Sequence, residues 1–308
     1  METKLIDEVF ISSAGMKILI LSRSTVLYST QSLVNATRRR HHAVKVVDHL
    51  HCNLSILNGR LGVRYQGSFL GRPDAVIPRI GSSVTSYGAA VVRHFELMGV
   101  YTVVSTEALL RSRDKRSALQ YLAAHNIPVP DTVFMATSEN VDTALDVLGK
   151  EYPVIIKMLQ STQGDGVLLG ENKQSSIAMA TSFLRIKEEI LLQRFIRESN
   201  GKDIRVFVVG GEVVATMERS AQPGEFRSNL HRGGDARKVK ITAEEKDIAI
   251  RAADLMGLKV AGVDLLRSKE GPVVLEVNAS PGLEGIERAT KVDIAGYIIK
   301  LIEDNAGS

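Results

Sequence analysis

Two carboxylates and an amide near the C-terminus have the side-chain types and spacing of a metal site. Asp264 falls in one predicted β-strand, and Glu276 and Asn278 fall in the next. Folding this hairpin about Glu270 places Asp264 opposite Glu276, with Asn278 two residues further along the same face. The opposed Cβ atoms are then about 5 Å apart, and two like charges repel unless a cation lies between them. Three oxygen-bearing side chains without His or Cys favour Mg²⁺ or Mn²⁺ over zinc.

The same register makes the other face of the hairpin aliphatic. The loop Lys269-Glu270-Gly271 has glycine at its third position, where a three-residue hairpin needs a left-handed residue. The alternative interpretation is an ordinary hairpin with two solvated carboxylates. The predicted pairs on that face are Val263 with Val277 and Leu265 with Leu275, and the same register places Leu266 opposite Val274 on the carboxylate face.

A second motif has the composition of a phosphate-binding loop. A predicted strand ends near Lys157, and a turn containing Gly164 and Gly166 leads into the next strand. Glycines let backbone N–H groups approach phosphate oxygens, and a lysine supplies a point charge. The motif is not a P-loop, because the Gly-Lys-[Ser/Thr] ending is missing. An ordinary hairpin turn is the alternative.

Two further segments could contact a nucleotide. The apolar run 191–196 could offer backbone groups to a purine edge, and Asp203 could accept hydrogen bonds from ribose hydroxyls. A core strand followed by a surface turn is the alternative there. The polar loop 226–234 carries two arginines, which could clamp a phosphoryl group or a carboxylate. Its alternative is a solvated basic loop.

The elements that must position these side chains fall into two regions. Residues 16–110 alternate strands and helices, which predicts an α/β domain with a mainly parallel sheet. No Gly-x-Gly-x-x-Gly follows the first strand, which argues against a dinucleotide site. Beyond residue 111, strands interrupted by glycines predict a more antiparallel α+β pattern. In the first region the predicted strands are 17–21, 44–47, 74–78 and 101–104, and the predicted helices are 29–40 and 87–98.

Composition limits the possible classes. The 308 residues are 44% hydrophobic and 24% charged, with a formal charge of +4, which is typical of a globular protein and compatible with acidic substrates. No apolar run is long enough to span a membrane. Residues 1–15 read as a loose extension rather than a signal peptide, and 304–308 as a tail. The single cysteine, Cys52, suits a reducing cytoplasm and is interpreted as buried filler.

Taken in order, these stretches resemble the ATP-grasp superfamily and, within it, the RimK-type α-L-glutamate ligases. The resemblance implies an α/β N-terminal domain at 16–110, followed by an α+β ATP-grasp domain at 111–303 whose two subdomains hold ATP between them. Two departures stand out: Arg194 replaces a usual Glu, and Ser161 replaces a usual Gly. The motifs that carry the resemblance are 113–115, 127–130, Lys157 with its glycine turn, 203–205, 227–234, 261–264 and 275–285.

The resemblance also implies roles for individual residues. The implied metal ligands are Asp264, Glu276 and Asn278, which would hold two Mg²⁺ or Mn²⁺ ions. The implied catalytic residues are Arg227, Asn229 and Arg205. The implied ATP-binding residues are Lys115, Lys157, Gly164, Gly166, Arg194, Phe195, Asp203, Arg227, Ser228 and Asn229.

The implied activity is ATP-driven amide-bond formation through an acyl phosphate, with L-glutamate as the added amino acid. The implied acceptor is the acidic C-terminal tail of a ribosomal small-subunit protein, and a small carboxylated metabolite is the open alternative. The resemblance further implies a homotetramer. From the residues themselves we expect a cytoplasmic protein that does not bind nucleic acid or membranes directly. A non-catalytic ATP-binding regulator and an RNA-binding protein remain as alternatives of other classes.

Overall fold

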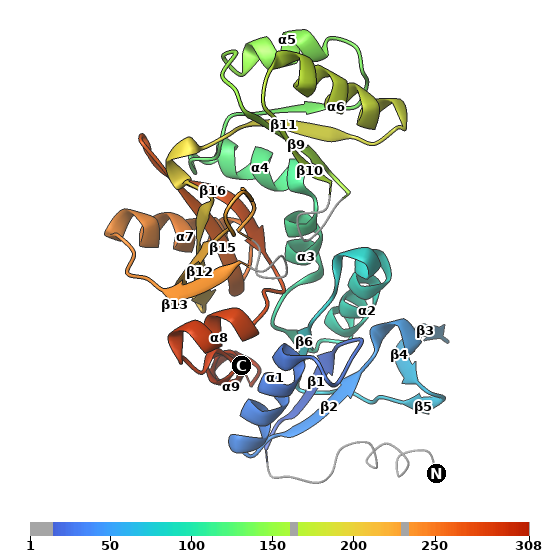
Figure 1. Cartoon of the computed structure of the whole chain (residues 1–308). Coiled ribbons are helices and arrows are strands. Elements are labelled where there is room, and N and C mark those ends of the chain that lie inside the picture. The colour runs from blue at the N-terminus through green and yellow to red at the C-terminus, as the bar shows by residue number, and fades with distance from the viewer. Residues whose placement is uncertain (1–14, 161–165, 229–233, 308) are drawn as a thin grey trace, which may run out of the picture.

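The computed structural model describes residues 15–160, 166–228 and 234–307. These residues form an N-terminal domain, a middle subdomain and a C-terminal subdomain (Figure 1). The hydrophobic core of the N-terminal domain is continuous with that of the C-terminal subdomain, whereas the middle subdomain has a core of its own. The chain is thus packed as one large unit and one smaller unit.

The N-terminal domain is built on the predicted parallel sheet. Its strand order is β2-β1-β6-β7, and every neighbouring pair is parallel. The apolar run of β1 is almost fully buried, as a central strand requires. The predicted bounds hold to within a few residues. The elements are β1 (Lys17–Leu21), α1 (Tyr28–Arg39), β2 (Ala43–Val47), η1 (His49–His51), β6 (Ala75–Pro78), η2 (Ser82–Val84), α2 (Thr85–Leu97) and β7 (Tyr101–Thr102).

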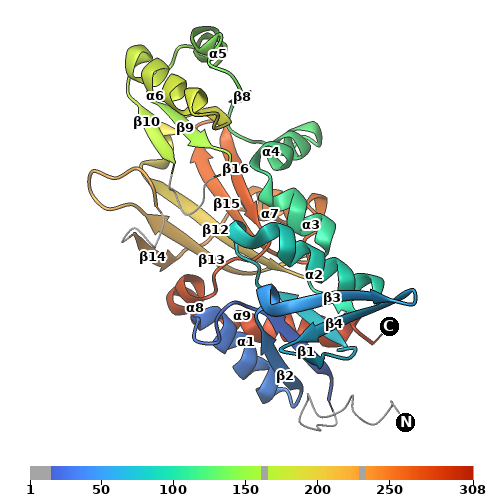
Figure 2. The ribbon, with the colours of Figure 1, turned by 90° about the vertical axis from the view of Figure 1, so that its right-hand side faces the viewer.

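A second sheet in this domain was not predicted from the sequence. Three antiparallel strands, β3 (Cys52–Leu57), β4 (Arg60–Tyr65) and β5 (Ser68–Phe69), form a ribbon beside the parallel sheet (Figure 2). The signal for it is Asn58-Gly59, where both residues have positive φ, as a two-residue hairpin turn requires. Cys52 is buried at the start of this ribbon, as expected of a filler residue.

Two helices connect the N-terminal domain to the rest of the chain. Helix α3 (Thr106–Arg113) ends directly before Asp114, and α4 (Lys115–Ala124) begins directly after it. The Asp114 carboxylate accepts hydrogen bonds from the Arg116 and Ser117 amides at 3.0 and 3.2 Å, so it caps α4. This cap fixes Lys115 as the first residue of α4.

The middle subdomain is an antiparallel sheet covered on one face by two helices. Its strand order is β10-β9-β11-β8. Val154, Ile156 and Leu192 pack under the helices, and the alternation of a strand therefore turns Lys157 and Gln193 to the opposite face. The elements are β8 (Thr132–Met135), α5 (Val141–Val147), β9 (Val154–Met158), β10 (Val167–Gly170), α6 (Lys173–Arg185) and β11 (Ile190–Arg194).

The C-terminal subdomain is a five-stranded antiparallel sheet with order β14-β13-β12-β15-β16. Its last helix lies against α1 of the N-terminal domain. Arg39 pairs there with Asp293 at 2.7 Å, and His42 contacts Glu303 at 2.7 Å. The elements are η3 (Arg197–Ser199), β12 (Lys202–Val209), β13 (Glu212–Ser220), β14 (Asp235–Lys238), α7 (Ala243–Leu255), β15 (Val260–Ser268), β16 (Gly271–Asn278), α8 (Glu284–Thr290) and α9 (Ile294–Asn305).

Candidate active site

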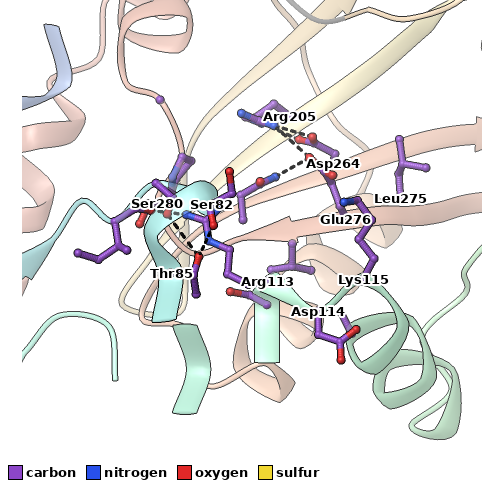
Figure 3. Close-up of a pocket in the computed structure, with 18 of the residues that line it drawn as sticks. Ser82, Thr85, Arg113, Asp114, Lys115, Arg205, Asp264, Leu275, Glu276 and Ser280 are labelled. Carbon is purple, nitrogen blue, oxygen red and sulfur yellow. Dashed lines mark hydrogen bonds and ion pairs between the residues drawn. The ribbon is translucent and has the colours of Figure 1, made fainter. Parts of the chain in front are cut away.

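A cleft of about 2250 Å³ opens where the three parts of the chain meet. All three contribute to its lining, and α3, α4 and the β15–β16 hairpin border it (Figure 3). Of the described residues, thirteen lysines and arginines line it, against eight aspartates and glutamates. The excess of cations makes the cleft a suitable site for anionic substrates.

The β15–β16 hairpin brings the two predicted metal-ligand carboxylates together. Asp264 pairs with Glu276 and Val263 with Val277, as the sequence predicts. The prediction of a three-residue loop is wrong, because Ser268 pairs with Gly271 across a two-residue turn.

The predicted register therefore fails between the turn and the carboxylates. Leu265 pairs with Val274 instead of Leu275, and Leu266 pairs with Val273 instead of Val274. An irregularity after Asp264 leaves Leu275 as one extra residue on β16. This bulge offsets the shorter turn, which restores the predicted register at the carboxylates.

Asp264 is held by two arginines from neighbouring strands. The Arg205 Nε donates to Asp264 Oδ1 at 2.6 Å, and the Arg219 Nη2 donates to Asp264 Oδ2 at 2.8 Å. The carboxylate is only 2% exposed. Burial opposes its ionisation, but Arg205 and Arg219 outweigh that effect and hold the pKa of Asp264 below its ordinary value. Asp264 is therefore ionised at every physiological pH.

Glu276 is the accessible member of the pair. Its side chain is 47% exposed, and its Oε1 accepts a hydrogen bond from Asn278 Nδ2 at 2.9 Å. Arg205 Nη2 lies 3.9 Å from the same oxygen, so the cation expected between the two carboxylates is here an arginine. Two carboxylates and an amide oxygen suit a hard divalent ion. The residues present thus fit Mg²⁺ or Mn²⁺, and their role as ligands stays a prediction.

Asp203 lies in a buried network beside this pair. Its carboxylate accepts from Arg219 Nε at 2.6 Å and from Ser228 Oγ at 2.6 Å, and only 5% of the residue is exposed. Arg219 therefore bridges Asp203 and Asp264. A contact between Asp203 and a ribose stays a prediction, and it would have to share carboxylate oxygens that already accept three hydrogen bonds.

The two predicted phosphate-binding lysines come from different elements, α4 and β9, and both line the cleft. Lys157 Nζ donates to Gln193 Oε1 at 2.8 Å, and Lys115 Nζ donates to the Leu159 carbonyl at 3.0 Å. Gly166 has a φ of +66°, which a glycine adopts without strain, and Gly164 lies outside the described residues.

Burial lowers the pKa of Lys157. Desolvation lowers the pKa of its ammonium to about 8, with Lys115 lowering it further and Glu276 opposing the shift. A bound polyphosphate would raise this pKa again. We therefore expect ATP affinity to fall as pH rises through about 8, and ATP binding near pH 8.5 to take up a fraction of a proton. Calorimetry in buffers of different ionisation enthalpy measures this uptake, which Lys157→Met should abolish.

Arg227 is held at the cleft wall by a neighbouring carboxylate. Its Nε and Nη2 donate to Glu225 at 2.9 and 2.7 Å, and this pairing lowers the pKa of Glu225 to about 2. Arg227 Nη1 also donates to the Val167 carbonyl at 3.3 Å, at the start of β10. Ser228 faces the cleft beside it, and Asn229 lies outside the described residues.

The adenine-side residues are placed where β11 ends. Arg194 is the last residue of β11, and Phe195 follows it along the cleft wall. The Arg194 side chain lies 3.3 Å from Glu270 and 3.4 Å from Asp131. The arginine that replaces a usual glutamate thus links the middle subdomain to the β15–β16 turn. Its backbone contact with adenine stays a prediction.

Two relevant residues were not assigned a role from the sequence. Arg219, from β13, neutralises both Asp203 and Asp264. Arg79 follows β6 directly and lines the cleft from the N-terminal domain. Its position after a parallel strand was the available signal, because ligands bind at the carboxyl ends of such strands.

Two family models together match nearly the whole chain. The RimK PreATP-grasp domain matches residues 16–109, and the RimK-like ATP-grasp domain matches residues 112–302. The chain belongs to the RimK family of ATP-grasp proteins. As the sequence predicts for a RimK-family protein, it is an ATP-dependent ligase with a pre-ATP-grasp domain and an ATP-grasp domain.

The RimK-family relatives are similar over their full length. A probable alpha-L-glutamate ligase of Nitrosococcus oceani is 52% identical over 291 residues, which are 94% of this chain and 96% of that protein. A probable alpha-L-glutamate ligase of Coxiella burnetii is 51% identical over the same shares.

Solved structures share the ATP-grasp fold. The ATP-grasp ligase PsnB, complexed with a precursor variant, Mg and ADP, superposes with a TM-score of 0.73 at 21% identity, covering 96% of this chain and 100% of that one. D-alanine–D-alanine ligase from Bacillus anthracis, complexed with ATP, gives 0.64 at 16% identity, covering 95% and 97%. At these identities the likeness shows the fold alone. Within the described part of the RimK-family chain, no helix is long and apolar enough to cross a membrane.

Proposed function

We propose that this chain is an ATP-dependent α-L-glutamate ligase that works through an acyl phosphate. The observation that carries the proposal is one cation-rich cleft in which the Asp264–Glu276 pair faces Lys115 and Lys157. Such a cleft suits a nucleoside triphosphate together with substrates that bear carboxylates. The names of the two relatives, which are about half identical over nearly the whole chain, support glutamate as the added amino acid.

The proposed reaction needs positioning and charge neutralisation rather than a protein nucleophile. An oxygen of the acceptor carboxylate attacks the γ-phosphorus, ADP leaves, and the amine of glutamate then attacks the acyl carbon and expels phosphate, with loss of a proton from nitrogen. Lys115, Lys157 and Arg227 hold phosphate oxygens during the transfer, and Ser228 and Asn229 complete this group. Mg²⁺ or Mn²⁺, held by Asp264, Glu276 and Asn278, would neutralise the phosphate charge.

The acceptor we propose is an acidic peptide tail, such as the C-terminus of a ribosomal small-subunit protein. The thirteen basic side chains of the cleft support a polyanionic acceptor. A small carboxylated metabolite has the same reacting group and is the competing outcome. A homotetramer and a second metal ion also remain proposals.

One assay separates these possibilities. ADP release is measured with each of the twenty amino acids, with and without a peptide that ends in several glutamates, and products are weighed by mass spectrometry. We expect release that depends on glutamate and peptide together, and a product heavier by one or more glutamyl residues. ATP binding without turnover under every condition would support a non-catalytic regulator instead.

Removing Lys157 tests the nucleotide site. Lys157→Met should weaken ATP binding by about 1–3 kcal/mol, because a charge-assisted contact to phosphate is lost. Isothermal calorimetry measures the change, and Lys173→Met, at an exposed lysine of the same subdomain, is the control. An unchanged ATP affinity would place Lys157 outside the phosphate site.

A further inference from the structure

Two arginines that line the cleft, Arg79 and Arg113, lie near each other, and none of the described carboxylates pairs with them. Arg79 follows β6, and its amide donates to the Leu21 carbonyl at 2.8 Å, which fixes it beside the end of β1. Arg113 ends α3, and its Nη2 donates to the Ile80 carbonyl, one residue beyond Arg79 (Figure 3). Among residues 15–160, 166–228 and 234–307, no carboxylate forms an ion pair with either one. Arg113 Nε is buried without a hydrogen-bond partner there.

This arrangement is unfavourable for the protein in isolation. Desolvation, and then the neighbouring Arg113 guanidinium, lowers the pKa of Arg79 to about 10. Desolvation also lowers the pKa of Arg113, and the charge of Glu276 only partly offsets it. Buried cations in folded proteins are ordinarily paired with an anion. The two arginines therefore lack an anion that a ligand can supply.

Their place in the sheet also indicates a ligand site. The order β2-β1-β6-β7 means that the chain leaves β1 toward one edge of the sheet and leaves β6 toward the other. The carboxyl ends of β1 and β6 thus flank a topological switch point, where open α/β sheets bind their ligands. Arg79 lies at this point, and α2 begins nearby, with its positive N-terminal dipole at Thr85.

The arginine pair lies beside the proposed triphosphate site but uses different residues. Arg113 precedes Lys115 by two residues across the α3–α4 junction, so the pair borders the phosphate-binding lysines without belonging to them. Ser280, from the segment after β16, hydrogen-bonds to the Pro78 carbonyl at 3.3 Å and brings the C-terminal subdomain to the same place. A planar guanidinium binds a carboxylate bidentately, whereas a lysine acts as a point charge.

We propose that Arg79 and Arg113 form a carboxylate anchor that holds an amino-acid or peptide substrate beside the nucleotide. The proposal rests on the ligase function above and names the residues that select acidic substrates. The carboxylate can come from the incoming glutamate or from the terminal glutamate of the acceptor. Both sources present the same group, so the experiment must distinguish them.

The test compares Arg79→Met, Arg113→Met and Arg79→Lys in the full chain. Arg60→Met, an exposed arginine on β4 of the same domain, is the matched control. For each variant, KM for glutamate, KM for the acceptor peptide and the Kd of ATP are measured, together with the melting temperature. We expect one carboxylate KM to rise about 10- to 100-fold in the Met variants, with ATP affinity within about twofold. Lysine should restore part of the loss, because it keeps the charge.

Each outcome either identifies which substrate supplies the bound carboxylate or rejects Arg79 and Arg113 as its anchor. A rise for glutamate alone identifies the incoming amino acid, and a rise for the peptide alone identifies the acceptor. Unchanged values for both, loss of ATP affinity alone, or a melting temperature lowered by several degrees in both Arg79 variants would overturn it. We expect the melting temperature of Arg79→Met to be unchanged or higher, because an unpaired cation is removed.

The anchor remains testable if the ligase function fails. In that case wild-type protein yields no glutamylated product with any acceptor. L-Glutamate and glutarate are then titrated by calorimetry into the ADP-loaded wild-type, Arg79→Met and Arg60→Met proteins. Binding that the wild type and Arg60→Met share and Arg79→Met loses supports the anchor alone. Equal binding, or none, in all three rejects it.

Discussion

Glu276→Gln should abolish ADP formation, by about 1000-fold or more, while the protein stays folded. Glu276 is the exposed carboxylate of the pair, and in the described structure its contacts are a hydrogen bond from Asn278 and the distant Arg205. The substitution keeps the shape of the side chain and removes one negative charge. In the proposed reaction Asp264 and Glu276 would hold a divalent ion that neutralises phosphate charge, so the loss of one carboxylate charge should prevent phosphoryl transfer.

The measurement is steady-state ADP release across a range of Mg²⁺ and Mn²⁺ concentrations, with thermal unfolding as the check on folding. Glu212→Gln is the control, since Glu212 is exposed on β13 of the same subdomain. Near-normal turnover of Glu276→Gln at limiting Mg²⁺ would remove Glu276 from the metal site. Asp264→Asn is a poorer test, because it removes the buried charge that pairs with Arg205 and leaves Arg219 with Asp203 alone.

The local sequence pattern was enough to predict the carboxylate pair, but not the turn length or the bulge of the hairpin that carries it. In the register that folding about Glu270 gives, the two-residue period of a strand puts Asp264 and Glu276 on one face, so their pairing could be predicted. The bulge at Leu275 could not, because a bulge is fixed by packing against neighbours rather than by the alternation of residue types. Two errors in the turn region, a shorter loop and a bulge, cancelled at the functional residues.

The charges that surround Asp264 come from strands distant in the sequence. Arg205 pairs with Asp264 across the β12–β15 ladder, and Arg219 reaches it from β13, one strand further away. The sequence showed an uncompensated pair of carboxylates and predicted a cation. It could not identify an arginine as that cation, because the order of strands in a sheet does not follow from the spacing of residues in one hairpin.

The fold of the N-terminal domain illustrates the same limit. The alternation of strands and helices predicted the parallel sheet, because parallel strands need a crossover connection, usually a helix. The β3–β4 ribbon was missed, although Asn58-Gly59 marks its turn. The core of this domain is continuous with that of the C-terminal subdomain, where α1 lies against α9 and where α3 and α4 contact β16, and no local pattern indicates these contacts.

Arg227→Lys should lose most of kcat, about 100-fold, and keep ATP affinity within about threefold. In the described structure the Arg227 side chain donates two hydrogen bonds to Glu225 and a third to the Val167 carbonyl of β10. These bonds hold the guanidinium at the wall of the cleft. A planar guanidinium can bind a phosphoryl group through two parallel hydrogen bonds, which a lysine cannot do. If this contact forms mainly in the transition state, its loss lowers kcat and kcat/KM together.

The measurement is the full set of steady-state constants for ATP, glutamate and acceptor, with ATP binding followed separately by calorimetry. Arg237→Lys is the matched control, because Arg237 lies on β14 and pairs with Glu218 at 2.8 Å, and its side chain is 70% exposed. Arg227 would be a substrate anchor if the mutant kept a normal kcat and showed a raised KM for glutamate or for the acceptor. Its place in phosphoryl transfer would then have to be abandoned, because an interaction that binds ground state and transition state equally changes KM alone.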